Sequence, residues 1–105
     1  MPVAFDLASH MNTRVLAVLC DRFDLHHVHC VDTARVIVTD TPDRVHRHRS
    51  RGKLVIQYLW HHEVRPVQDP CVAIVSRDCD DPLRGKLRIV QELRRLSVQS
   101  IPEDR

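Results

Sequence analysis

The chain has 105 residues, 43% of them apolar and 29% charged, with only two glycines and six prolines. This composition suits one domain with its own hydrophobic core and excludes a disordered or fibrous chain. The formal net charge of +2 is small, so the total charge alone does not indicate a nucleic-acid-binding protein. We therefore expect a single domain over residues 1–105.

No segment of the sequence has the length and polarity of a membrane span. The longest apolar run, VLAVLC at 15–20, has six residues, whereas a membrane helix needs about 20. The first eleven residues carry an acid and no basic group before the apolar positions, which argues against an export signal. We expect a cytoplasmic protein without membrane contact, or a nuclear one if the source is eukaryotic or viral.

The cysteines are expected to be thiols. A chain without an export signal and with enough apolar residues for a core does not need disulfides, and unpaired cysteines are usually buried. The sequence therefore predicts mostly buried thiols at Cys20, Cys30, Cys71 and Cys79.

The amino-terminal segment has helical periodicity over about 3–23. Apolar residues recur there at steps of three and four, and the competing interpretation is a buried strand at 14–20. The residues of the predicted apolar face are Val3, Leu7, Met11, Val15, Val18 and Leu19.

The next segments have the composition of a hairpin. ARVIVT at 34–39 is rich in β-branched residues and predicts a strand. In DTPD at 40–43, Asp and Pro stand at the positions that a type I turn prefers. We therefore expect 44–50 to form a second, polar strand after a turn at Pro42.

A second hairpin is predicted at Gly52, which adopts a positive φ without steric cost. In the strand expected over 53–64, Leu54, Ile56, Tyr58 and Trp60 alternate on one face. A loop bracketed by prolines then leads to CVAIVS at 71–76, which predicts an interior strand.

The last element is a helix over about 82–96. Asp81 is a suitable cap, Pro82 suits the first helical position, and leucines recur at helical spacing. Residues 97–105 are expected to be a short tail, with Ile101 docked on the domain.

Together these elements predict an α+β domain in the order α-β-β-β-β-α. The sheet, over about 34–76, is expected to be mostly antiparallel and covered on one face by the two helices.

Basic residues gather in two segments, 43–53 and 83–96, each with a charge of +4. On an exposed strand or helix face they form a candidate surface for nucleic acid or for an acidic partner, because guanidinium groups bind phosphates and carboxylates in bidentate fashion. A charged edge strand that only prevents aggregation, and a solvated helix face, explain the same pattern. The candidate residues are Arg44, Arg47, Arg49, Arg51, Lys53, Arg84, Arg88 and Arg95.

Histidine and cysteine are enriched in LHHVHC at 25–30. Both are zinc ligands, but the close cysteine pairs of most zinc sites are absent, so a site has to be assembled from distant elements. The candidate ligands are His27, His29, Cys30 and His62.

His27-Val28-His29 is also similar to the His-hydrophobic-His pattern of rolling-circle replication and transposition nucleases. In those enzymes the two histidines hold a metal and a tyrosine attacks DNA, and Tyr58 is the only tyrosine here. The rest of the chain does not match, and Tyr58 alternates with core residues.

Other catalytic motifs are missing from the sequence. There is no glycine-rich phosphate loop and no nucleophile-elbow serine motif, so the sequence favours a protein that is not an enzyme.

Three functions therefore remain, in this order of preference. The first is a small non-enzymatic regulatory or adaptor domain that binds a protein partner or forms a homodimer, without a cofactor. The second is a nucleic-acid-binding module built on the basic segment 44–53 and the helix face 84–95. The third is a zinc-binding protein built on the histidine cluster.

Overall fold

The structure of the protein is a computed structural model, which describes residues 1–99 and the side chains of residues 1–97. It contains four strands and three helices in the order β1-α1-β2-α2-β3-β4-α3. The strands are β1 (Val3–Asp6), β2 (Val36–Thr39), β3 (Leu54–Leu59) and β4 (Val72–Ser76). The helices are α1 (His10–Arg22), α2 (Pro42–Ser50) and α3 (Pro82–Gln99). The predicted docking of Ile101 lies outside the described residues.

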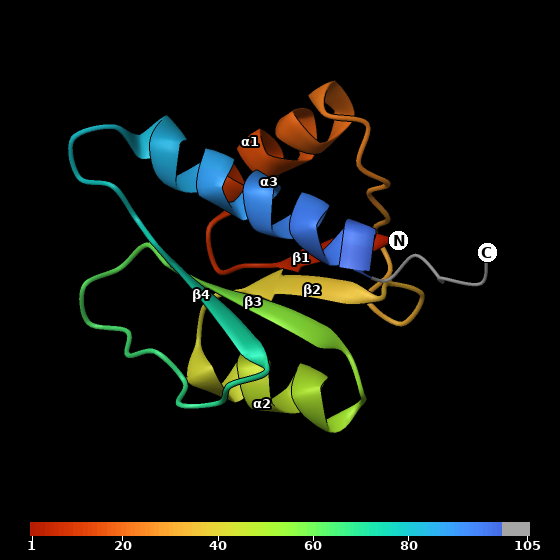
Figure 1. The fold of residues 1–105 in the computed structure, drawn as a ribbon. Coiled ribbons are helices and arrows are strands. Elements are labelled where there is room, and N and C mark those ends of the chain that lie inside the picture. The colour runs from red at the N-terminus through yellow and green to blue at the C-terminus, as the bar shows by residue number, and fades with distance from the viewer. Residues whose placement is uncertain (100–105) are drawn as a thin grey trace.

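The sheet is parallel throughout, with the strand order β1-β2-β3-β4. The expectation of a mostly antiparallel sheet is therefore wrong. Parallel neighbours need a crossover connection, which α1, α2 and the segment 60–71 provide in turn. Helices α1 and α3 pack on one face, as predicted for the amino-terminal and carboxy-terminal helices, whereas α2, which was predicted to be a strand, covers the other face (Figure 1).

The predicted helix over 3–23 is two elements. Residues 3–6 form β1, and α1 begins after Ser9, whose side-chain oxygen accepts a hydrogen bond from the Asn12 amide at 3.2 Å. The apolar spacing at Val3 and Leu7 coincides with a helical period, yet Ser9 is the residue type that starts a helix. The cap therefore separates two elements that periodicity had joined.

The predicted polar strand at 44–50 is helix α2. Thr41 stands at the cap position, Pro42 at the first helical position and Asp43 in the first turn, which suit a helix start as well as a turn. Val45 and His48 are buried three residues apart, as a helix requires. Gly52, with φ of 77°, ends this helix and does not close a hairpin.

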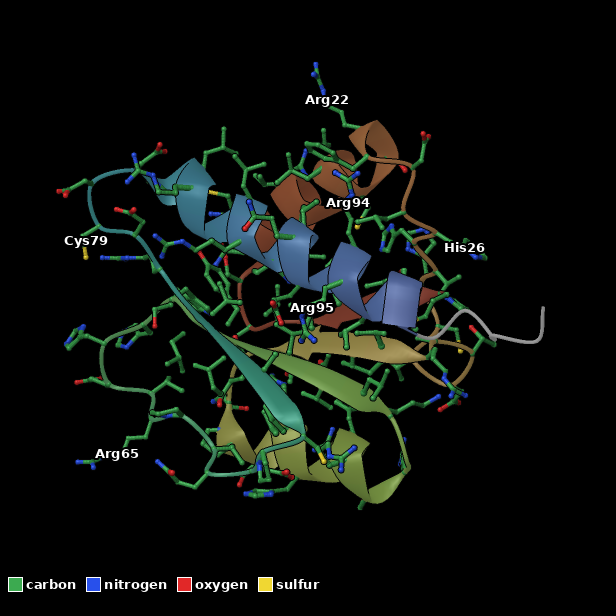
Figure 2. The ribbon with its side chains drawn as sticks, in the orientation of Figure 1. Arg22, His26, Arg65, Cys79, Arg94 and Arg95 are labelled. Atoms are coloured by element: carbon green, nitrogen blue, oxygen red, sulfur yellow. The ribbon has the colours of Figure 1, made fainter. Side chains whose placement is uncertain are left out.

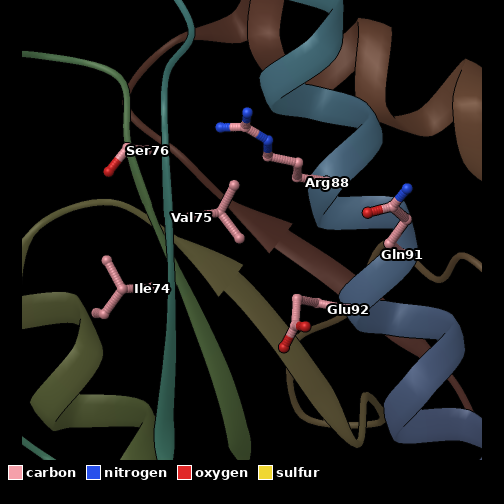
Figure 3. Close-up of a pocket in the computed structure, with 6 residues that line it drawn as sticks. All are labelled: Ile74, Val75, Ser76, Arg88, Gln91 and Glu92. Atoms are coloured by element: carbon pink, nitrogen blue, oxygen red, sulfur yellow. The ribbon is translucent and has the colours of Figure 1, made fainter.

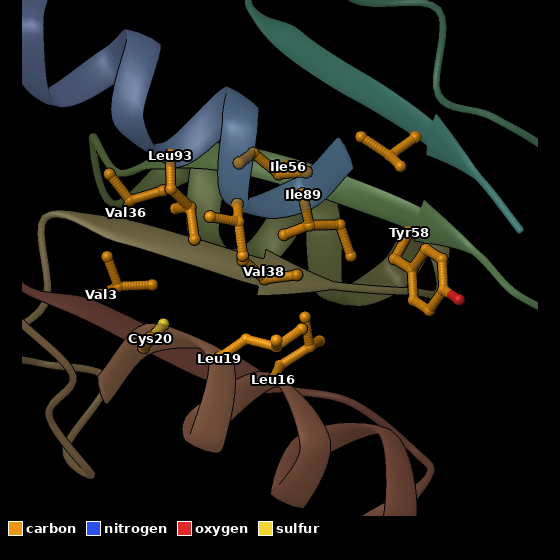
Figure 4. Close-up of a cluster of buried hydrophobic side chains, with 12 residues drawn as sticks. Val3, Leu16, Leu19, Cys20, Val36, Val38, Ile56, Tyr58, Ile89 and Leu93 are labelled. Carbon is orange, nitrogen blue, oxygen red and sulfur yellow. The ribbon is translucent and has the colours of Figure 1, made fainter. Parts of the chain in front are cut away.

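The hydrophobic core has two layers, one on each face of the sheet. Odd-numbered residues of β1 and even-numbered residues of β2 and β3 face α1 and α3, and Figure 4 shows Val36, Val38 and Ile56 between the strands and the helices. The predicted face of Leu54, Ile56, Tyr58 and Trp60 belongs to this core. On the opposite face, Val45 of α2 packs on Val55 and Val72.

The chain between α1 and β2 passes round the outer edge of β1. His27 forms an isolated parallel bridge with Val3. Val28 and Val31 then pack on Ala4 and Ile37, which point away from α1. This segment covers part of the β1 edge. β4 is the other edge strand, so its predicted position as an interior strand is wrong.

Candidate functional site

The carboxyl ends of β1 and β2 are where this type of sheet is expected to form a ligand site. The chain leaves β1 toward the face of α1 and leaves β2 toward the face of α2. Open parallel sheets bind ligands in the crevice where the connections diverge in this way. Asp6 is the last residue of β1, and Asp40 directly follows β2, so two carboxylates meet at this point.

The carboxylate of Asp40 is 1% exposed and accepts four hydrogen bonds. Its Oδ2 atom accepts from the Ala8 amide at 2.8 Å and from the Trp60 indole at 2.9 Å. Its Oδ1 atom accepts from the Thr41 amide at 2.9 Å and from Arg44 Nη1 at 3.0 Å. Four donors already engage both oxygens, so Asp40 acts as a structural anchor in this conformation.

Asp6 is paired just as closely. His48 Nε2 lies 2.8 Å from Asp6 Oδ2, and Arg44 Nε lies 3.5 Å from Asp6 Oδ1. Arg44 therefore joins both carboxylates. Groups of the protein itself therefore engage both carboxylates of this crevice.

Sequence reasoning did not select Asp6, Asp40, His48 or Trp60. The available signal was an acid at the end of each of two apolar strand segments, VAFD and VIVTD. That pattern becomes meaningful only when the two strands run parallel, because their carboxyl ends then lie side by side.

The basic residues of 43–53 lie on α2 and in the turn after it, and most are paired within the protein. Arg49 Nε lies 3.5 Å from Asp69, and Arg51 Nη1 lies 3.8 Å from Asp32. Lys53 Nζ donates to the Asp32 and Ala34 carbonyls at 2.9 and 2.6 Å. Arg47 is exposed on α2.

The other predicted basic residues lie on α3. Arg84 pairs with Asp78 at 3.4 Å and Arg95 with Glu92 at 2.7 Å, while Arg88 is exposed. Because α2 and α3 cover opposite faces of the sheet, the two predicted basic sets do not form one continuous surface.

The predicted metal ligands lie at two ends of the molecule. His27 is beside the first residue of β1, whereas His62 follows the carboxyl end of β3. The rings of His27 and His29 are in contact, with centroids 5.0 Å apart, and burial and then His29 lower the pKa of His27. In residues 1–97, no group of three or more His, Cys, Asp or Glu side chains is arranged to hold a metal ion.

Tyr58 lies in the core, as its alternation with core residues predicts, whereas the cysteines are placed differently from expectation. Tyr58 is 1% exposed in the core, so it is not positioned to attack DNA. All four cysteines are free thiols, but only Cys20 is buried, so the expectation of mostly buried thiols is wrong. Figure 2 shows Cys79 projecting from the loop between β4 and α3.

Exposed apolar side chains lie on α1 and on β4, among other places. On α1, Met11 and Val18 are 74% and 58% exposed beside Val15. On the edge strand β4, Ile74 is 40% exposed. A groove runs between this strand and α3, lined by Ile74, Ser76, Arg88, Gln91 and Glu92 (Figure 3).

Comparisons with known proteins do not supply a family. No family model, no curated protein and no solved structure matches the chain. Among the described residues, no helix is long and apolar enough to cross a membrane.

Proposed function

We propose that the protein is a small non-enzymatic regulatory or adaptor domain that acts through protein–protein contacts, and that β4 pairs with β4 of a second copy. The observation that carries this proposal is the uncharged edge strand β4, which pairs only with β3 in the part of the chain that the structure describes. Residues 71–76, CVAIVS, contain no charge and no proline. Such an edge presents unpaired backbone groups to any strand that can reach it.

The outward backbone groups can be assigned from the alternation of the strand. The Arg77 amide donates to the Leu59 carbonyl of β3 at 2.9 Å. Successive residues alternate in direction, so the amides and carbonyls of Ile74 and Ser76 point away from β3. These groups are the ones that a second strand would pair with.

The surfaces beside β4 suit a two-fold related copy. In an antiparallel pair centred on Ile74, the two isoleucine side chains meet on the same face of the combined sheet. The other face carries both signs of charge, with Arg88 and Glu92 in the groove shown in Figure 3. A two-fold axis brings Arg88 of one copy toward Glu92 of the other, which favours a self-complementary interface.

The crevice at the carboxyl ends of β1 and β2 supports the non-enzymatic part of the proposal. Asp40 holds four internal donors, and Asp6 is paired with His48 and Arg44. A catalytic acid or base has to reach a substrate proton. The exposed thiols of three cysteines also fit a reducing compartment such as the cytoplasm.

The test is the mass of the protein in solution. In sedimentation velocity from about 1 μM to about 1 mM, the wild-type protein should shift from 12.2 kDa to twice that mass. Ile74→Lys should remain monomeric without losing thermal stability, because lysine is tolerated on exposed edge strands. Met11→Lys, on the exposed face of α1, is the matched control and should still dimerise. A dimer lost in Met11→Lys and retained in Ile74→Lys would reject the β4 interface.

A second candidate, binding to a nucleic-acid backbone, rests on a hollow at the amino ends of the strands. Arg35, Arg51 and Lys53 line it, and exposed Arg47 lies on the nearby end of α2. Phosphate binding by these groups would weaken as salt is raised. Detectable, salt-sensitive binding of duplex DNA that is lost in Arg35→Ala and Arg47→Ala supports this candidate, and its absence at low salt rejects it.

A further inference from the structure

A hollow lies at the carboxyl ends of β3 and β4, apart from the crevice of β1 and β2 and from the β4 groove. Its volume is about 230 Å³, and its polar lining comes from His61 and His62 after β3 and from Arg77 and Cys79 after β4. The two histidine rings are stacked, with centroids 4.8 Å apart. The loops that follow parallel strands carry ligand-binding residues in many sheets of this type.

Among the side chains of residues 1–97, Arg77 in this hollow and Lys86 beside it have no acidic partner. Arg77 Nη2 donates to Cys79 Sγ at 3.8 Å and forms no salt bridge with a described residue. Lys86 of α3 is 8% exposed, and its Nζ atom lies 5.8 Å from the centre of the Tyr58 ring. Within residues 1–97, no carboxylate pairs with Lys86 either.

Asp78, which follows Arg77 in the chain, and Glu63, which follows His62, are engaged by other groups. Asp78 accepts hydrogen bonds from the Asp80 and Asp81 amides at 2.9 and 3.2 Å and pairs with Arg84 at 3.4 Å. Glu63 lies 3.9 Å from His61 at the exposed rim. Neither acid neutralises Arg77 or Lys86.

This arrangement costs free energy when the hollow is empty of anions. Burial, and then the charge of Arg77, lower the pKa of Lys86, because both effects disfavour the charged amine. The Tyr58 hydroxyl is buried without a hydrogen-bond partner in the described structure, and burial raises its pKa. An anion close to Arg77 and Lys86 would relieve the repulsion between these two side chains.

We propose that this hollow binds a small oxyanion of the phosphate class, with Arg77 as its direct ligand, His61 and His62 as hydrogen-bonding walls, and Lys86 as a second positive charge. A guanidinium group matches the geometry of two phosphate oxygens. Inorganic phosphate and the phosphate group of a small metabolite share this chemistry. The site is independent of the proposed β4 interface, because it uses different side chains and needs one copy of the chain.

The experiment is isothermal titration with inorganic phosphate at constant ionic strength. The wild-type protein should bind one phosphate saturably, and Arg77→Ala should weaken the affinity about tenfold or more. Arg77 is exposed, so this variant should fold normally. Arg22→Ala removes an exposed arginine in the last turn of α1, which projects away from the domain in Figure 2, and should bind phosphate as the wild type does. Absence of saturable binding, or equal weakening in both variants, would overturn the proposal.

Lys86→Met provides a second readout that does not depend on Arg77. Without phosphate its melting temperature should exceed that of the wild type, because the substitution removes an uncompensated buried charge. Phosphate should raise the melting temperature of the wild type and have a clearly smaller effect on this variant. A variant that gains as much from phosphate as the wild type would contradict the role given to Lys86.

Discussion

At the scale of single residues, Asp40 links four separate segments of the chain through hydrogen bonds. Its four donors come from the loop before α1, the start of α2, the body of α2 and the end of β3. Charged hydrogen bonds of this kind are each worth about 1.5–3 kcal/mol, and a buried donor left without a partner is costly. The carboxylate therefore fixes where four segments meet.

Asp40→Ala should lower the free energy of unfolding by about 3 kcal/mol, because Arg44 and Trp60 lose a buried acceptor. Urea unfolding measures this loss. Asp43→Ala, an exposed acid in the first turn of α2, is the control and should cost only about 0.3–1 kcal/mol through the helix dipole. Equal losses in the two variants would show that the Asp40 network does not hold the fold.

Cys20 gives a pH-dependent prediction. Burial and then the charge of Asp21 raise the pKa of the Cys20 thiol from its ordinary value of 9.0 to about 11. Between these values the unfolded chain releases the thiol proton while the folded chain retains it, so stability falls as the pH rises. Urea unfolding across this window should show a smaller fall for Cys20→Val than for the wild type.

The burial of Cys20 also predicts its reactivity. In native protein, a thiol reagent should modify Cys30, Cys71 and Cys79 and spare Cys20. Rapid modification of all four thiols would contradict the burial of Cys20.

At the scale of elements, the sequence predicted α3 and the strands at 34–39, 53–64 and 71–76 correctly in type, although all three strands are shorter and α3 is longer in the structure. It failed where two patterns overlap. The arginines of 44–50 alternate like a strand, whereas Thr41, Pro42 and Asp43 start a helix, and burial of Val45 and His48 selects the helix. Local charge patterns do not show which residues will find a core.

Whether neighbouring strands run parallel depends on the segments that connect them, and most of the connection 60–71 has no helical or strand periodicity in the sequence. The connection 60–71 carries no helix, yet it crosses the sheet because buried Gln57 holds it. The Gln57 amide nitrogen donates to the Arg65 carbonyl at 3.0 Å, and its oxygen accepts from the Val67 amide at 2.8 Å. A loop of this length also fits an antiparallel hairpin, so the sequence alone could not decide the direction.

Gly52 offers a test of how α2 ends. Its φ of 77° is unfavourable for residues with a side chain, and a Cβ atom there would meet no other atom within 4 Å. Gly52→Ala should therefore destabilise the protein by about 1–2 kcal/mol through the backbone alone, whereas Gly52→Asn should cost less. Thermal unfolding measures both, and an alanine variant as stable as the wild type would refute the left-handed conformation.

At the scale of the whole molecule, the parallel sheet decides which predicted site residues can act together. It separates the two basic segments onto opposite faces and places His27 and His62 at opposite ends of the strands. It also brings Asp6 beside Asp40, and His61 and His62 beside Arg77. The residue types of the candidate sites were visible in the sequence, but their grouping followed from strand direction.

The two edges of the sheet differ in how far other segments of the chain cover them. The β1 edge is partly covered by the bridge between Val3 and His27, whereas β4 has a neighbour only in β3 within the described chain. An uncharged strand in this position tends to associate. The proposed function therefore depends on the state of β4 in solution.

Disulfide trapping at Ile74 tests this claim most directly. In an antiparallel pair centred on this residue, the two Cα atoms should lie about 5.5 Å apart, within the range that a disulfide spans. We predict that Ile74→Cys, in a protein with Cys30, Cys71 and Cys79 replaced by serine, forms a covalent dimer under mild oxidation. Val18→Cys in the same background, on the exposed face of α1, should stay monomeric. A monomer for Ile74→Cys, or equal cross-linking at both positions, would contradict pairing through β4.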